Sequence, residues 1–137
     1  MNTKLLHKDL SYQIQGAVMD VRVSFGSGHK ELVYQRALEE ELKLRNINFT
    51  REKSIKVISP KTGKVLGIYR PDFVVDDKVI LEVKAVDALP SHLVNQLYDY
   101  LRNSDYELGY MVNFSSPKLY IKRFIFTNNR KTWLRSS

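Results

Sequence analysis

The chain has 137 residues, and its 43% hydrophobic and 27% charged content is typical of a folded globular domain rather than a disordered chain or a fibre. It contains no cysteine, which excludes disulfide bonds, thiolate metal ligands and a cysteine nucleophile. No apolar run could span a bilayer, and the N-terminal residues lack the apolar core of a signal peptide. We expect a single domain over residues 1–137, soluble and cytoplasmic.

The net charge of +7 is unevenly distributed along the chain. No acidic residue follows Glu107, whereas six basic residues do: Lys118, Lys122, Arg123, Arg130, Lys131 and Arg135. A basic segment favours a polyanionic partner, so we assign the first five of them to nucleic-acid binding and expect a basic tail over about residues 127–137. The alternative is a solvated tail whose charges bind nothing.

Helical periodicity predicts a first amphipathic helix over residues 10–25 and a second from 29 or 30 to 45, separated by the breaker Gly26-Ser27-Gly28. Glu31 lies on the apolar face of the second helix, one turn before Tyr34. A glutamate on this face either belongs to a site or only complements the helix dipole in the first turn.

Strands are expected next, over residues 49–58 and from 64 to 69 into a central hairpin. A third helix should cover 91–103, and two strands should cover 108–114 and 118–126. This order predicts an α/β fold with a mixed sheet of about five strands flanked by helices. Because the third helix is a crossover, the strands that it joins should be parallel.

The central hairpin carries charges inside its apolar runs. Asp72 begins the first run, and Glu82 and Lys84 interrupt the second. A three-residue loop sets Val75 opposite Val79, and hence Asp72 opposite Glu82, whereas a two-residue loop sends Glu82 to the other face. We predict the three-residue loop, Asp76-Asp77-Lys78, or an equivalent bulge.

Two facing carboxylates repel each other, and a cation between them relieves the repulsion. Oxygen ligands without cysteine or histidine favour Mg²⁺ or Mn²⁺ over Zn²⁺. A lysine beside such an ion can assist the attack of water on a phosphodiester. The alternative is an exposed Glu–Lys pair on a surface hairpin, worth ~0–1 kcal/mol.

These residues resemble a known nuclease superfamily. Pro71-Asp72 followed by Glu82-Val83-Lys84 is similar to the motif of the PD-(D/E)XK nucleases. The segment from Gly28 through Glu31 to Tyr34 resembles the signature of the small GxxExxY proteins in that superfamily, and Gln96 to Tyr100 resembles the QxxxY motif of its exonuclease-like branch. The similarity runs from about Gly16 to Arg130, with the motifs in the expected order.

The resemblance implies a restriction-endonuclease-like core and a set of roles. Asp72, Glu82 and the backbone carbonyl of Val83 would ligate Mg²⁺, and Lys84 would act on the attacking water. Glu31 would join the site directly or through a water, and Gln96 and Tyr100 would orient Lys84 or contact the scissile phosphate. Gly28 would serve the turn before the second helix, and Tyr34 would serve packing.

The first reading is therefore a metal-dependent nuclease, with DNA preferred over RNA as substrate. The alternative is a nucleic-acid-binding or partner-binding module that keeps the fold without turnover. The small size of the chain favours a homodimer or a partner protein in either case.

Overall fold

The computed structural model describes residues 6–131 and 133. Its elements are α1 (Lys8–Phe25), α2 (Glu31–Leu44), β1 (Phe49–Arg51), β2 (Ile55–Ile58), β3 (Val65–Tyr69), β4 (Phe73–Val75), β5 (Val79–Lys84), α3 (Ser91–Arg102), β6 (Leu108–Asn113), β7 (Tyr120–Ile125) and a 3-10 turn (Asn128–Arg130).

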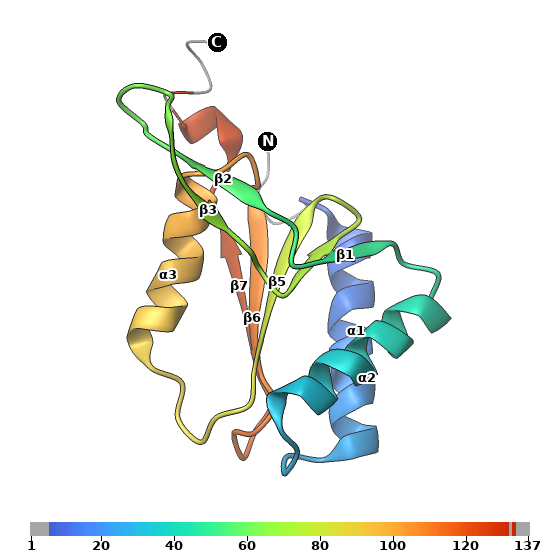
Figure 1. The fold of residues 1–137 in the computed structure, drawn as a ribbon. Coiled ribbons are helices and arrows are strands. Elements are labelled where there is room, and N and C mark those ends of the chain that lie inside the picture. Colours follow the sequence, from blue (N-terminus) through green and yellow to red (C-terminus); the bar gives the residue numbers. More distant parts are fainter. Residues whose placement is uncertain (1–5, 132, 134–137) are drawn as a thin grey trace.

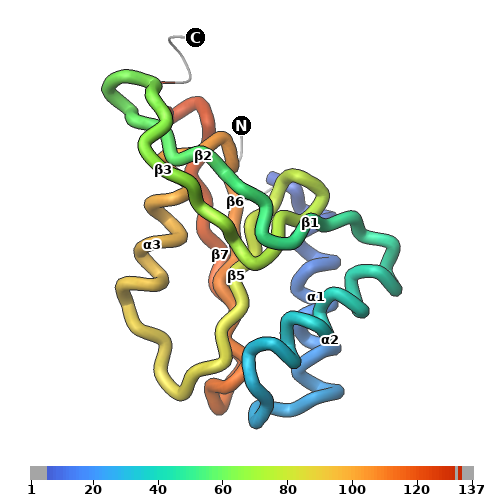
Figure 2. The backbone as a smooth tube through the Cα atoms, in the orientation of Figure 1, coloured from blue at the N-terminus to red at the C-terminus, as the bar shows by residue number. Residues whose placement is uncertain are grey.

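A five-stranded mixed sheet in the order β1-β4-β5-β6-β7 forms the centre of the molecule. Helices α1 and α2 cover one face and α3 covers the other (Figures 1 and 2). β5 and β6 are parallel and are joined through α3, whereas the other neighbours are antiparallel. The predicted α/β class, the five strands and the parallel pair around the crossover helix are thus confirmed.

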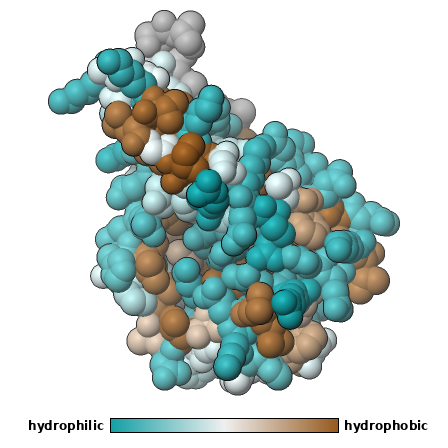
Figure 3. Space-filling model, viewed as in Figure 1, coloured by the Kyte–Doolittle hydropathy of each residue, from teal (hydrophilic) through white to brown (hydrophobic). Residues whose placement is uncertain are grey.

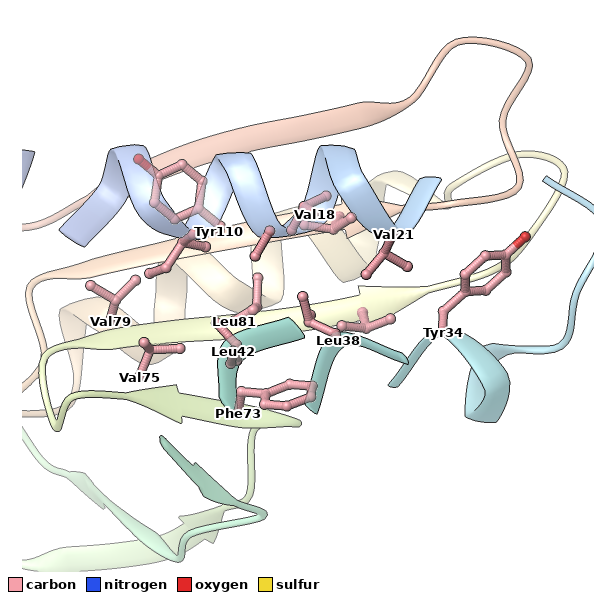
Figure 4. Close-up of a cluster of buried hydrophobic side chains, with 14 of the residues drawn as sticks. Val18, Val21, Tyr34, Leu38, Leu42, Phe73, Val75, Val79, Leu81 and Tyr110 are labelled. Atoms are coloured by element: carbon pink, nitrogen blue, oxygen red, sulfur yellow. The ribbon is translucent and has the colours of Figure 1, made fainter. Parts of the chain in front are cut away.

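Strand alternation divides the apolar side chains of the sheet between two cores. One core packs α1 and α2 against alternate residues of the strands, among them Phe73, Leu81 and Tyr110 (Figure 4). The other packs α3 against the residues between them, such as Val74, Ile80 and Met111. Since Glu82 continues the Ile80 series, its side chain belongs to the face that α3 covers.

The single strand expected over residues 49–58 is wrong, because the chain turns at Glu52, whose φ of 50° is left-handed. Residues 49–51 join the main sheet as β1, and 55–58 pair instead with β3 in a separate two-stranded sheet. The segment expected to lead from residue 64 into the hairpin is likewise divided into β3 and β4. The β2–β3 hairpin therefore projects beside the main sheet (Figure 1).

The expected tail is attached to the body as far as residue 131. The Asn128 N–H donates to the Glu107 carboxylate at 2.8 Å, and Thr127 is buried. Residues 132 and 134–137, with Arg135, lie outside the described part. No helix of the described residues is long and apolar enough to cross a membrane.

Candidate active site

The loop of the central hairpin fixes which residues face each other. Val75 pairs with Val79, and the Lys78 N–H donates to the Val75 carbonyl at 3.0 Å. Asp76 and Asp77 both have φ of 51°, a left-handed conformation that aspartate tolerates better than most residues. The three-residue loop predicted from the sequence is confirmed.

One residue beyond the last paired position, this register brings Asp72 and Glu82 together. The Asp72 N–H donates to Glu82 Oε1 at 2.8 Å, and the Val83 N–H donates to Asp72 Oδ2 at 2.7 Å. Each carboxylate is thus held by a backbone N–H of the neighbouring strand. These reciprocal bonds fix both side chains before any ligand arrives.

Burial makes this carboxylate pair difficult to ionise. The pKa of Glu82 is raised from 4.5 to about 7, first by desolvation and then by repulsion from Asp72. The pKa of Asp72 is also raised by desolvation, although the Val83 N–H and the charge of Lys84 oppose the rise. A bound cation would relieve both causes, because it replaces lost hydration and screens the repulsion.

Tyr69 is a site residue that the sequence reading missed. Its ring stacks on Tyr100 of α3, with centroids 3.6 Å apart and planes 5° from parallel. Its hydroxyl is buried and makes no hydrogen bond of standard geometry within the described residues. Burial and the nearby Glu82 carboxylate raise the pKa of this hydroxyl, so it stays protonated against the carboxylate pair. The one available signal was an aromatic residue just before Arg70-Pro71-Asp72.

Glu31 approaches the same charges from the first turn of α2. Its carboxylate is half-buried and accepts a hydrogen bond from Gln35 at 3.1 Å. Desolvation raises its pKa, with Lys84 lowering and Asp72 raising it in addition. Glu31 therefore lies within the electrostatic range of Asp72 and Lys84. A glutamate that only complemented the helix dipole would not need to lie near these charges.

Arg51 of β1 is a second residue without a sequence signal. Its Nε donates to the Asp72 carbonyl at 2.8 Å, and its Nη2 donates to Gln35 at 2.6 Å. The guanidinium also pairs with Glu39 and lies 4.4 Å from the centre of the Phe73 ring. Arg51 therefore ties helix α2 to the backbone of Asp72.

We expect Arg51→Lys to lower the free energy of unfolding by about 1–3 kcal/mol, because an ammonium cannot replace the planar fork that serves three acceptors. Denaturant unfolding measures the change. Arg36→Lys, at an exposed arginine of α2, is the matched control. Equal unfolding midpoints for the two variants would contradict the role assigned to Arg51.

The QxxxY pair lies at the margin of the site. Gln96 is exposed, and its amide donates to the Tyr100 hydroxyl at 3.4 Å. Tyr100 is connected to the carboxylates through its stacking on Tyr69. By sequence, Gln96 is three residues after Leu93 and four before Tyr100, which sets it in the apolar stripe of α3. Its exposure shows that the side chain does not pack toward the sheet as this spacing predicts.

The basic residues assigned to nucleic-acid binding divide into two groups. Lys118, Lys122 and Arg130 are exposed, and Lys122 lies on the row that runs from Glu82 through Met111. Arg123 is half-buried, and its guanidinium donates to the Leu6 carbonyl at 3.3 Å.

Lys131 does not fit the role assigned to it. It is 2% exposed, and its ammonium donates to the carbonyls of Ser104 and Tyr106 and to the Asn128 side chain at 2.7–2.8 Å. This buried cation fastens the C-terminal segment to the body. It is not placed to contact a nucleic acid.

Tyr34 of the GxxExxY segment serves the fold, as the resemblance implies. Tyr34 stacks on Phe114 at 4.6 Å between centroids, and its hydroxyl donates to the Gly26 carbonyl at 2.6 Å. The residue of this turn with left-handed φ, 72°, is Gly26 rather than Gly28. The Asn113 side chain fixes the backbone just after β5, because its amide oxygen accepts from the Val86 N–H and its amide nitrogen donates to the Val86 carbonyl.

The residues present suit a divalent cation with few protein ligands. Within residues 6–131 and 133, no three His, Cys, Asp or Glu side chains lie close enough together to enclose a metal ion. Mg²⁺, however, is commonly held by one or two carboxylates and keeps several waters. A half-buried, mutually repelling Asp–Glu pair matches that requirement better than it matches a structural zinc site.

Comparison with known proteins shows the family of the chain. A family model described as the PD-(D/E)XK nuclease superfamily matches residues 8–124, so the chain belongs to that superfamily. A solved structure titled "Crystal structure of SSO0001" is similar at a TM-score of 0.48 and 22% identity, over 98% of this chain and 82% of that one. No curated protein matches the chain. Membership indicates a nuclease on a restriction-endonuclease-like fold.

Proposed function

We propose that this protein is a Mg²⁺-dependent nuclease, with Mn²⁺ as a substitute, that hydrolyses phosphodiester bonds of DNA in preference to RNA. The observation that carries the proposal is the pair formed by Asp72 and Glu82, two half-buried carboxylates that reciprocal backbone hydrogen bonds hold side by side. Burying two such charges is costly unless a cation neutralises them. The segment from Gly28 through Glu31 to Tyr34 supports, as part of this proposal, membership of the small GxxExxY group of the superfamily.

Asp72 and Glu82 would hold the ion, with the Val83 carbonyl as a further oxygen ligand and Glu31 reaching it through water. The backbone hydrogen bonds use Asp72 Oδ2 and Glu82 Oε1, so the other oxygen of each carboxylate is the candidate ligand. When bound, the ion would supply charge neutralisation at the carboxylates and at the phosphoryl oxygens.

Lys84 extends from β5 on the same face as Glu82, two residues further along the strand. Its ammonium has three donors, which orient the attacking water and stabilise negative charge on the phosphate. Glu31 lies within the electrostatic range of this ammonium, and its negative charge would stabilise the protonated lysine. Tyr100 positions Tyr69 against Glu82, and Gln96, being exposed, contacts the substrate backbone.

A homodimer or a partner protein would extend the substrate contacts of so small a domain. The same fold could also bind nucleic acid without cleaving it, and the ordered carboxylate pair argues for turnover instead. The rigid, preorganised arrangement of Asp72 is what a catalytic centre needs and what a binding surface does not.

The test is a cleavage assay over linear duplex DNA, single-stranded DNA, branched DNA and RNA, each with Mg²⁺, with Mn²⁺ and with a chelator. We expect metal-dependent cleavage of at least one DNA substrate. Binding of nucleic acid without cleavage across the whole panel would favour the binding module. Absence of cleavage, binding and metal affinity would refute both readings.

A further inference from the structure

The projecting β2–β3 hairpin has a surface that the proposed chemistry does not use. Its residues 55–70 include four basic side chains and no acidic one, and all four are exposed: Lys56, Lys61, Lys64 and Arg70. Beside them, Val65, Leu66 and Ile68 are 50%, 70% and 50% exposed. Figure 3 shows a hydrophobic patch on the projecting hairpin, with hydrophilic residues around it.

The two faces of the hairpin differ sharply. Ile55 pairs with Tyr69 across the hairpin, and both are buried against the body of the protein. Lys56 pairs with Ile68 one residue further on, and both are exposed. Because strand residues alternate between faces, the outward face presents a cation beside an apolar side chain.

The hairpin is also fixed relative to the carboxylates. The Ile58 N–H donates to the Asn103 carbonyl at 2.8 Å, and the Asn103 amide donates back to Ile58 at 3.2 Å. Tyr69, the last residue of β3, packs beside Glu82, and only Arg70 and Pro71 separate it from Asp72. Arg70, the next residue, is exposed and lies two residues before Asp72, so a ligand on the outward face would reach the edge of the site at Arg70.

We propose that the β2–β3 hairpin binds duplex DNA as a two-stranded ribbon in the major groove and so directs a phosphodiester of that duplex to Asp72 and Glu82. The inference rests on the proposed nuclease function and names its substrate as a duplex. Lys56, Lys64 and Arg70 contact the phosphates on either side of the groove, and Leu66 and Ile68 contact the base edges within it.

Dimensions and chemistry favour this occupant. The strands of four and five residues extend about 15 Å, and a two-stranded ribbon fits a groove about 12 Å wide. Platforms for single strands use exposed aromatic rings, whereas the one aromatic residue of the hairpin, Tyr69, is buried. The deep, narrow major groove of A-form RNA excludes such a ribbon.

A second copy of the chain is a less suitable occupant of this face. If β3 paired antiparallel with itself about Gly67, Lys64 would lie opposite Arg70 of the second copy, and the two like charges would repel each other.

The test compares Lys56→Glu/Lys64→Glu with the wild type in binding a labelled DNA duplex over a salt series. A chelator is present throughout, so that cleavage does not enter the measurement. We expect the affinity to fall at least about tenfold and the salt slope to flatten by about 2, because two phosphate contacts are lost. Lys8→Glu/Lys43→Glu, at exposed lysines of α1 and α2, imposes the same change of net charge and should leave both quantities near wild type.

Two further variants keep the test decisive. Lys56→Gln/Lys64→Gln perturbs the hairpin less and should show a smaller loss in the same direction. Leu66→Ser should weaken duplex binding several-fold without altering the salt slope, because it removes a groove contact and no phosphate contact. Circular dichroism and sedimentation check the fold and the mass of each variant.

The outcomes separate this inference from the proposed function. The proposal that the hairpin binds the major groove would be overturned if the Glu and Gln variants of Lys56 and Lys64 both bound the duplex with wild-type affinity. It would also be overturned if the hairpin and helix variants lost equal affinity, or if a hairpin variant changed its mass in solution without a change in DNA binding. Cleavage that persists alongside such a result would leave the nuclease standing. Hairpin-dependent duplex binding without any cleavage would support the ribbon and refute the nuclease.

Discussion

Replacing Lys84 or Asp72 with alanine should abolish cleavage, lowering the rate by about 10³-fold or more, while the fold is retained. Lys84 supplies the positive charge beside the carboxylate pair, and Asp72 carries one of the two charges that hold the ion. Both are half-buried at the edge of the cores rather than inside them. Single-turnover cleavage with Mg²⁺, beside a thermal melt of each variant, measures the two effects separately.

Lys78→Ala is the matched control for this first prediction. Lys78 lies in the loop of the same hairpin, is exposed, and pairs only loosely with Asp76 at 3.4 Å. Its removal should leave the cleavage rate within about twofold of wild type, since exposed pairs contribute little. A Lys84→Ala protein that cleaves as fast as the Lys78→Ala protein would remove Lys84 from the mechanism.

The part of the site within the central hairpin could be predicted from sequence because a strand has only two faces. A three-residue loop makes Asp72 face Glu82, whereas a two-residue loop puts them on opposite faces. The length of the loop therefore decides whether the two carboxylates form a pair. The structure pairs Val75 with Val79, as the three-residue loop requires. The parallel strands around α3 followed for a similar reason, since a crossover helix leaves few alternatives.

The remaining contacts depend on distances that no local pattern encodes. Arg51 and Tyr69 come to the site from different sheets, because the chain turns at the left-handed Glu52, so that β1 joins the main sheet and β2 pairs with β3. Lys131 carries the same charge as its neighbours in the sequence, and only tertiary packing buries it. Gln96 fits the apolar stripe of α3 by spacing, yet it lies at the exposed margin of the helix.

Glu82→Gln should stabilise the metal-free protein at high pH. In the folded state the pKa of Glu82 is about 7, against 4.5 as the ordinary value. Between these values the folded state keeps a proton that the unfolded state has lost, so the free energy of unfolding falls as pH rises through the window. The loss is complete above pH 7 and amounts to roughly 3 kcal/mol. The Glu82→Gln substitution removes this loss of stability, and the amide oxygen of glutamine can still accept a hydrogen bond from the Asp72 N–H.

Denaturant unfolding with a chelator, followed from acid to about pH 8, measures this effect. The wild type should lose stability relative to Glu82→Gln as pH rises above 4.5, and the two should converge below that pH. Glu40→Gln, at an exposed glutamate of α2, should track the wild type throughout.

Adding Mg²⁺ above pH 7 should then reverse the order of the two proteins. Binding to the folded state raises the melting temperature only where the site can hold the ion, so the wild type gains stability and Glu82→Gln does not. Below pH 7 the gain should shrink, because the ion must displace the proton on Glu82. An equal response to Mg²⁺ in both proteins would show that the ion binds elsewhere, and the half-buried Asp72–Glu82 pair would then have a purely structural role.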